Sequence, residues 1–270
     1  MIMEKSNHMI GFILISLFVF MILLFELQLF TLLALFSLGL FIAIAFIKEE
    51  NRLFIWVTLA FLAGQLLQLY GDRFLDAIVT NSYVNAVMNR FLILVPILLI
   101  SYVAYMFKRK ANLYWNRPDW NEKIYFPFIW SGFHSLKASG FLAAALSVNI
   151  AVFLFFIFFN GGELFLLEAP LFIAAFSLVN GLLEEILWRG VLLTRFAAMV
   201  GEKWAVLFNG AAFGFSHLAY GYSFISCLGF AIGGLFLAGL TIRSASLLPA
   251  ALWHICLNLL MILSGVITIS

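Results

Sequence analysis

Charged residues are scarce in this chain, and their scarcity decides its class. Only 10% of the 270 residues are Asp, Glu, Lys or Arg, whereas 65% are hydrophobic and 32 are Phe. Soluble globular domains do not have this composition. The formal net charge of +2 is also too small to indicate nucleic acid as a partner. The sequence therefore excludes a soluble domain and predicts a protein of the lipid bilayer.

Cysteine is rare as well. The two cysteines, Cys227 and Cys256, both fall in apolar runs, so nothing indicates a disulfide framework. The first apolar run follows a basic residue, Lys5, but residues 24–27 lack the small side chains of a signal-peptide cleavage site. We therefore expect the first run to stay in the protein as a membrane span.

Long apolar runs recur along the whole chain. A helix of about 20 apolar residues crosses the roughly 30 Å hydrocarbon core of a bilayer. The seventh run is short, so the sequence predicts an all-α, polytopic membrane helical bundle with eight or nine transmembrane helices. The predicted spans are residues 9–25, 29–47, 53–70, 91–107, 140–159, 171–198, 205–217, 222–242 and 247–267.

Basic residues indicate the orientation of these spans. With the N-terminus inside, twelve lysines and arginines fall in inner segments, against only Arg73 and Arg90 in outer ones. Such a bias is typical of the cytoplasmic side. We expect an integral protein of the cell (plasma) membrane with a cytoplasmic N-terminus.

The chain is predicted to divide near residue 139. Residues 1–139 would form an N-terminal four-span membrane module that ends in a cytoplasmic linker, and residues 140–270 a second membrane domain. The linker, residues 108–139, mixes basic residues with aromatic ones such as Trp115, Trp120 and Trp130. Amphipathic rings of this kind favour the headgroup layer, so we expect the linker to rest on the membrane surface.

Two adjacent carboxylates, Glu184 and Glu185, interrupt the apolar run 171–198. Ionisable groups inside a membrane are costly and are usually retained for function. Arg189 follows Glu185 by four residues, a spacing that places both on one face of an α-helix and predicts an ion pair. Glu184 has no basic residue at that spacing. A purely structural ion pair would explain Glu185 and Arg189 but not Glu184, which is the candidate proton acceptor.

Three further polar residues stand alone in downstream apolar runs: His217, then His254 and Asn258. Gly210 and Gly214 precede His217 with the spacing that lets two helices approach closely. His254 and Asn258 are four residues apart and share a helical face. One such histidine could simply satisfy a backbone carbonyl, but polar sites on three helices together predict one active site.

These motifs resemble the CAAX protease and bacteriocin-processing (CPBP, or Abi) family, which includes the Ras-converting endopeptidases. The resemblance covers about residues 166–262 and rests on Glu184-Glu185-x-x-x-Arg189, Phe213-x-x-x-His217 and His254-x-x-x-Asn258, in that order. It implies an intramembrane endopeptidase and makes residues 140–270 the catalytic domain.

The resemblance also implies a role for each residue. Glu184 would activate water with the help of His217, while His254 and Asn258 would stabilise the oxyanion, and Glu185 with Arg189 would be a supporting ion pair. Zinc or another divalent metal remains possible, with Glu184, His217 and His254 as candidate ligands, although the His-Glu-x-x-His spacing of common zinc proteases is missing. We favour metal-free glutamate catalysis and commit to no cofactor.

The expected partners are a protein or peptide substrate in the membrane, prenylated or otherwise membrane-associated, and the lipid bilayer itself. The alternative is a non-catalytic membrane protein, either an immunity or scaffold protein or a proton-coupled transporter, because paired acids and histidines also build proton relays. The inverted repeats of many transporters are not visible in this sequence.

Overall fold

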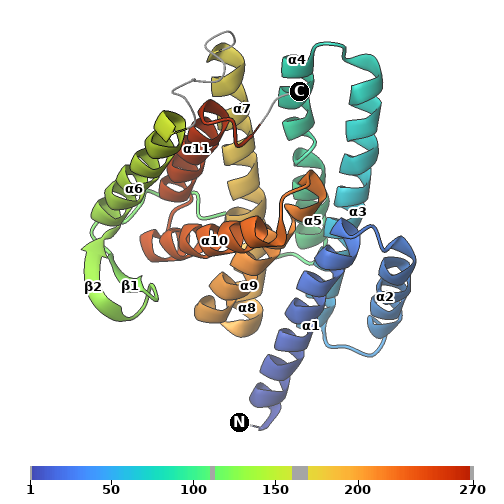
Figure 1. Cartoon of the computed structure of the whole chain (residues 1–270). Helices are drawn as coiled ribbons and strands as arrows, with labels where there is room; N and C mark the ends of the chain where they lie inside the picture. Colours follow the sequence, from blue (N-terminus) through green and yellow to red (C-terminus); the bar gives the residue numbers. More distant parts are fainter. Residues whose placement is uncertain (1, 110–112, 160–169, 268–270) are drawn as a thin grey trace. The chain divides into compact units, whose positions relative to one another are not determined.

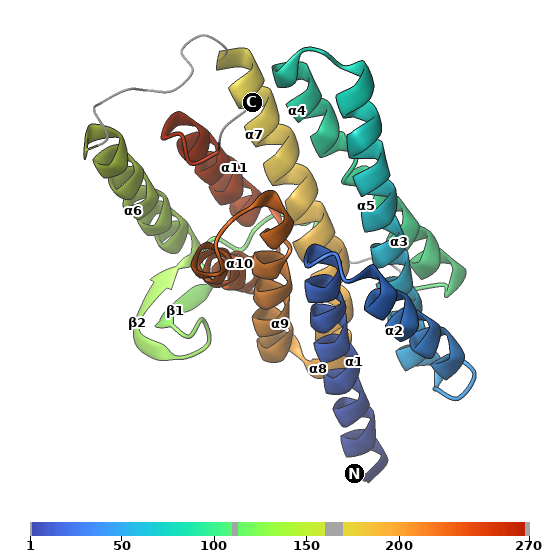
Figure 2. The ribbon, with the colours of Figure 1, turned by 45° about the vertical axis from the view of Figure 1, so that its right-hand side comes forward.

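The computed structural model describes residues 2–109, 113–159 and 170–267 and is drawn in Figures 1 and 2. The chain forms two compact units, each assembled from separate stretches. Unit 1 contains the described parts of residues 1–65, 96–113 and 188–239, and unit 2 those of residues 66–95, 114–187 and 240–270. The predicted division of the chain near residue 139 into an N-terminal module and a catalytic domain stays a prediction.

Helices dominate the described residues, as the composition predicts. Six segments are long and apolar enough to cross a membrane, so the chain is an integral membrane protein. Two shorter apolar helices, α2 and α11, add to them, and the count of eight or nine spans stays a prediction. The α-helices are α1 (Ile2–Glu26), α2 (Phe30–Ala43), α3 (Glu49–Ile78), α4 (Ser82–Phe91), α5 (Leu94–Met106), α6 (Ala138–Phe159), α7 (Pro170–Glu185), α8 (Leu193–Val200), α9 (Glu202–Phe215), α10 (Phe224–Ser244) and α11 (Leu248–Leu263).

Several helix ends differ from those the apolar runs predict. Helix α3 continues to Ile78, and α4 begins at Ser82, so Arg73 and Arg90 lie in helices, and the side of the membrane that they face stays a prediction. Hydropathy alone misses these turns because the few charged residues there lower the local average without breaking the helix. Helix α9 ends at Phe215, which places His217 just beyond it, at the start of a short 3₁₀ turn, Leu218–Tyr220.

The linker contains the one exception to the all-α prediction among the described residues. Strands β1 (Lys123–Pro127) and β2 (Gly132–Lys137) form an antiparallel hairpin in which Lys123 is opposite Lys137. The Arg243 guanidinium donates to the Lys123 carbonyl at 2.8 and 3.0 Å and forms an ion pair with Glu122. These contacts attach the hairpin to the end of α10. Phe126, Phe128 and Phe133 on it are exposed, consistent with the predicted position at the membrane surface.

In unit 1, helix α1 packs against α8 and α9. Phe18 of α1 packs against Phe196 of α8, with ring centroids 5.3 Å apart, and against Phe61 of α3, with ring centroids 5.1 Å apart. Helix α9 approaches α10 closely through glycine, as the Gly210–Gly214 spacing predicts. A Cβ at Gly214 would lie 2.5 Å from the Ala231 nitrogen, and one at Gly210 would lie 2.7 Å from the Leu235 nitrogen.

In unit 2, helix α7 lies between α11 and α4, and α6 covers another side of α11 (Figures 1 and 2). Ile173 and Phe176 of α7 bury themselves against Ile262 of α11. Gly181 allows the two helices to meet, because a Cβ there would lie 3.0 Å from the Ile255 nitrogen. The close contact places the carboxyl end of α7 beside the middle of α11.

The glycine contact between α9 and α10 generates a stability prediction. Gly214→Ala should lower the free energy of unfolding by about 1–3 kcal/mol, because the added methyl meets backbone atoms that cannot move aside independently. The matched control is Gly233→Ala in α10, where a Cβ would meet nothing within 4 Å. Thermal unfolding in detergent measures both. Equal melting temperatures for the two variants would contradict the close helix contact.

Candidate active site

The best-defined polar contact in unit 2 joins α7 to α11. The Nδ1 atom of His254 lies 2.7 Å from Oε1 of Glu185, and the Glu185 side chain is fully buried. An ionised carboxylate can only accept hydrogen bonds, so Nδ1 of His254 is the donor. The contact fixes the ring orientation and leaves Nε2 as the atom available for chemistry.

Glu184 lies on the other side of the same imidazole. Its Oε2 atom is 3.5 Å from Nε2 of His254, and both side chains are almost completely buried. Among the described residues this oxygen has no hydrogen-bond partner. A buried polar atom without a partner is costly and calls for an explanation, of which a catalytic role is one. The two glutamates thus flank His254, one holding the ring and the other facing its second nitrogen.

Asn258 lies one helical turn after His254 on α11 and is 4% exposed. Its Nδ2 atom is buried and lacks a hydrogen-bond acceptor within the described part of the chain. An amide N–H held in this way can donate to a charge that develops on a substrate oxygen. Asn258 therefore adds a donor to the side of α11 that carries His254.

The helix after Glu185 is not α-helical. Residues Ile186–Leu192 form a π-helix, η1, a rare geometry that is frequent at functional sites. The spacing argument for the pair of Glu185 and Arg189 assumes a regular α-helix, whereas the intervening residues are π-helical. The pair itself stays a prediction. Arg189 belongs to unit 1, where it donates to the Gly234 carbonyl at 3.2 Å and lies 4.3 Å from the Phe213 ring centroid.

His217 also belongs to unit 1, at the end of α9. Its Nδ1 lies 2.8 Å from the Phe213 carbonyl oxygen, which can only accept, so Nδ1 carries the proton and Nε2 is the basic atom. The ring packs 4.7 Å from that of Phe230 on α10. The structure thus brings together Glu184, Glu185, His254 and Asn258 in unit 2, whereas Arg189 and His217 occupy unit 1.

Two polar contacts near these residues escaped the sequence analysis. In unit 2, Arg90 of α4 donates to Oδ1 of Asn180 at 3.4 Å and lies 5.4 Å from the Phe176 ring centroid. In unit 1, the amide of Asn209 donates to the Trp188 carbonyl at 2.9 Å, within the π-helix. The signal for both was present, because Asn180 and Asn209 are isolated amides in apolar helices, where polar groups are retained only with a partner.

The described residues contain no group of three or more His, Cys, Asp or Glu side chains arranged to hold a metal ion. Within unit 2, Glu184 and Nε2 of His254 provide two donors, whereas a catalytic zinc takes three protein ligands. The third candidate ligand, His217, belongs to unit 1, and the choice between metal-free and metal-dependent catalysis stays a prediction.

The contact between Glu185 and His254 can be measured without any assay of activity. Glu185→Ala should cost about 2 kcal/mol of stability or more, because it leaves a buried imidazole N–H without an acceptor. Combined with His254→Ala, the loss should be smaller than the sum of the single losses by about 1–3 kcal/mol. Unfolding of the four chains of this double-mutant cycle in detergent measures the coupling. Strictly additive losses would show that the two side chains do not interact.

Comparison with known proteins identifies the region that carries these residues. No curated protein and no solved structure matched the chain significantly. Residues 165–260 match the model of the family described as type II CAAX prenyl endopeptidase Rce1-like. The match includes Glu184, Glu185, Arg189, His217, His254 and Asn258, and it agrees with the resemblance that the motifs indicate. The chain therefore carries a domain of the Rce1-like CAAX prenyl endopeptidase family over residues 165–260.

Proposed function

We propose that this protein is an intramembrane endopeptidase that uses Glu184 to activate water. The observation that carries the proposal is the buried group of Glu184, His254 and Glu185, which lies inside the family-matched region. Family membership suggests a membrane protease, and the Glu184 carboxylate supplies the base that peptide hydrolysis requires.

In the proposed reaction, Glu184 takes a proton from water while the oxygen attacks the carbonyl carbon of the scissile peptide bond. The tetrahedral intermediate then collapses, the C–N bond breaks, and the proton passes to the leaving amine. His217 assists Glu184, a role that rests on the family resemblance and on the basic Nε2 that its bond to Phe213 leaves.

His254 and Asn258 stabilise the negative oxygen of the intermediate. Glu185 accepts the proton of Nδ1 of His254, so the donor to the oxyanion is the Nε2–H of the doubly protonated ring. The Asn258 amide supplies a second N–H, and its orphaned Nδ2 atom supports this role. Donors fixed before the reaction stabilise the transition state without a reorganisation cost. Glu185 is thus a positioning residue for His254.

The proposed substrates are proteins or peptides of the membrane, either prenylated or held there by another anchor. The site lies on helices that belong to candidate membrane spans or pack against them, so the peptide bond must reach it at the membrane. We place the protein in the cell membrane with the N-terminus in the cytoplasm, in accordance with the distribution of basic residues.

A proton-coupled transporter is the second candidate. Glu184, His254 and Glu185 form a contiguous acid–imidazole–acid chain, and such chains also conduct protons in pumps and carriers. The two functions separate in proteoliposomes. A protease cleaves a co-reconstituted peptide without a pH gradient, whereas a carrier produces flux only when a gradient drives it.

Glu184→Gln tests the catalytic assignment on whichever membrane proteins the cell supplies as substrates. The substitution keeps the size of the side chain but removes the base, so proteolysis should fall below detection while the melting temperature stays close to that of the natural protein. In cells, uncleaved precursors should accumulate in membranes that contain Glu184→Gln, as they do in a deletion strain. Quantitative proteomics of the membranes measures this accumulation.

The matched control for this test is Glu202→Gln, because Glu202 is an exposed residue in the first turn of α9. Membranes that contain it should resemble those with the natural protein. Normal processing of every membrane protein in the Glu184→Gln strain would contradict the assignment of Glu184 as the base.

Asn258 distinguishes an oxyanion donor from a metal ligand. Asn258→Ala should reduce kcat by on the order of 10²-fold with little change in KM, since the donor acts on the transition state. Asn258→Asp should be at least as damaging, because an ionised acceptor repels the oxyanion. Both variants are compared by steady-state cleavage of a processed substrate. Near-normal activity of Asn258→Asp, together with stoichiometric zinc by elemental analysis, would favour metal ligation, because aspartate binds zinc well.

A further inference from the structure

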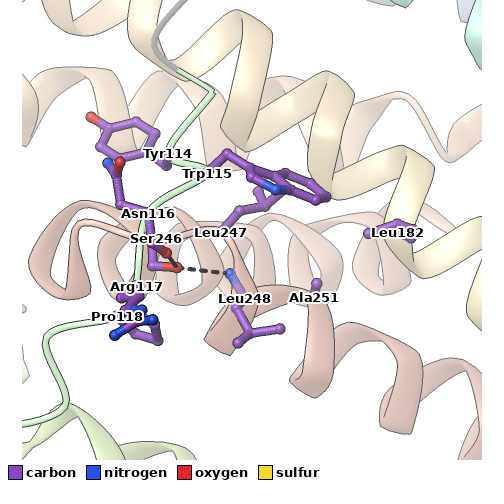
Figure 3. A pocket seen from close by; sticks show the side chains of 10 residues that line it. All are labelled: Tyr114, Trp115, Asn116, Arg117, Pro118, Leu182, Ser246, Leu247, Leu248 and Ala251. Carbon is purple, nitrogen blue, oxygen red and sulfur yellow. Dashed lines mark hydrogen bonds between the residues drawn. The ribbon is translucent and has the colours of Figure 1, made fainter.

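A pocket of about 350 Å³ opens in unit 2 between the linker, α7 and the start of α11. Trp115 and Pro118 of the linker form one wall, Leu248 and Ala251 of α11 form another, and Leu182 of α7 completes the lining (Figure 3). The lining is predominantly apolar. This volume lies at the small end of the range found for ligand sites. The pocket can therefore hold a side chain but not a folded partner.

The position of the pocket links it to the candidate active site. Leu182 precedes Glu185 by three residues on α7, and Ala251 precedes His254 by three residues on α11. Residues three apart share a helical face, and Glu185 and His254 are hydrogen-bonded to each other. Two walls of the pocket are therefore one helical turn from the side chains proposed to act on the peptide bond.

Hydrogen bonds hold the linker wall in place. The Leu247 N–H donates to the Tyr114 carbonyl at 2.9 Å, and the Asp119 N–H donates to the Ser244 carbonyl at 2.8 Å. Between them, the Ser246 hydroxyl donates to the Asn116 carbonyl at 2.7 Å. The same hydroxyl oxygen accepts from the Leu248 N–H at 3.3 Å (Figure 3). The linker is thus attached to the turn between α10 and α11 along both sides of the pocket, which makes the pocket a preformed feature.

Apolar surface at the pocket is left uncovered. Trp115 is 69% exposed and Leu248 is 48% exposed, and an apolar group seated between them would bury this surface. The polar neighbours Asn116 and Arg117 also border the pocket, where they can meet the peptide backbone beside such a group. A peptide side chain matches both the apolar interior and this polar border.

We infer that this pocket is a specificity subsite that receives an apolar side chain of the peptide substrate, close to the bond that is cleaved. The inference rests on the proposed function and adds to it the class of side chain that the enzyme selects. Ala251 limits the depth of the subsite, because its small side chain is buried in the wall nearest to His254. Trp115 forms the outer wall. A large aliphatic or aromatic residue is preferred there over glycine.

Photocrosslinking tests the subsite independently of turnover. The probes are short peptides of Ala, Ser and Gly that carry a single photoleucine, incubated with the Glu184→Gln protein in lipid nanodiscs so that no peptide is cleaved. Crosslinks should map to residues 114–118 and 247–251. Excess leucine peptide should displace the photoleucine peptide at least about tenfold better than the matched glycine peptide, in proportion to the burial of one leucine side chain.

Two variants make the test specific to the pocket. Ala251→Leu fills the subsite and should reduce crosslinking about tenfold or more, whereas Ala143→Leu, at an exposed position of α6, should leave it unchanged. Trp115→Ala removes the outer wall at a position exposed enough to tolerate the change, and it should weaken crosslinking in the same direction. Melting temperatures of all three variants show whether each chain is folded.

Crosslinks elsewhere in the chain, or crosslinks that Ala251→Leu does not reduce, would overturn the inference. A phospholipid with a photoreactive acyl chain is the competing occupant. If it labels residues 114–118 and 247–251 and peptides do not displace it, the pocket is a lipid site. If membranes with Glu184→Gln accumulate no precursor, the proposed proteolysis fails, and the crosslink map still decides which group the pocket holds.

Discussion

The hydrogen bond between Glu185 and His254 is the contact on which the candidate site depends. It joins two helices across an apolar interior, where leaving either partner alone would cost several kcal/mol. The bond determines which imidazole nitrogen carries a proton and thereby directs the other nitrogen toward Glu184. Glu184, Asn258 and the neighbouring pocket all take their positions from the two helices that this bond connects.

Close packing makes that bond possible. Gly181, one helical turn before Glu185, is the point where α7 meets the backbone of α11. A larger side chain there would separate the helices and lengthen the distance between Glu185 and His254. The apolar cluster of Ile173, Phe176 and Ile262 supports the same contact further along α7. The polar site therefore depends on the steric fit of residues that have no chemical role.

Local sequence patterns could predict the helices but not the contacts between them. Hydropathy indicates the membrane class, and isolated polar residues single out Glu184, Glu185, His254 and Asn258, which the structure places in unit 2. The hydrogen bond between Glu185 and His254 lies outside such patterns, because the two residues are 69 positions apart. No periodicity encodes a contact between distant helices. The β-hairpin and the π-helix were missed for a related reason, since each depends on contacts outside its own segment.

The π-helix shows how the chain accommodates a buried cation near this site. Residues after Glu185 leave the α-helical register, so the side chains of η1 do not follow the faces that α-helical periodicity assigns. In unit 1, the Arg189 guanidinium meets the Gly234 carbonyl and the Phe213 ring, and both contacts stabilise a cation.

Gly234 is required for this arrangement. A Cβ at that position would lie 3.3 Å from the guanidinium and 2.8 Å from the Phe213 ring, so a larger residue would displace both of them. The same glycine faces Gly210 of α9, with a Cβ 3.2 Å from its Cα. The close approach of α9 to α10 and the burial of Arg189 therefore both require that residue 234 has no side chain. In an apolar bundle, glycine is what lets backbone carbonyls serve as partners for a charge.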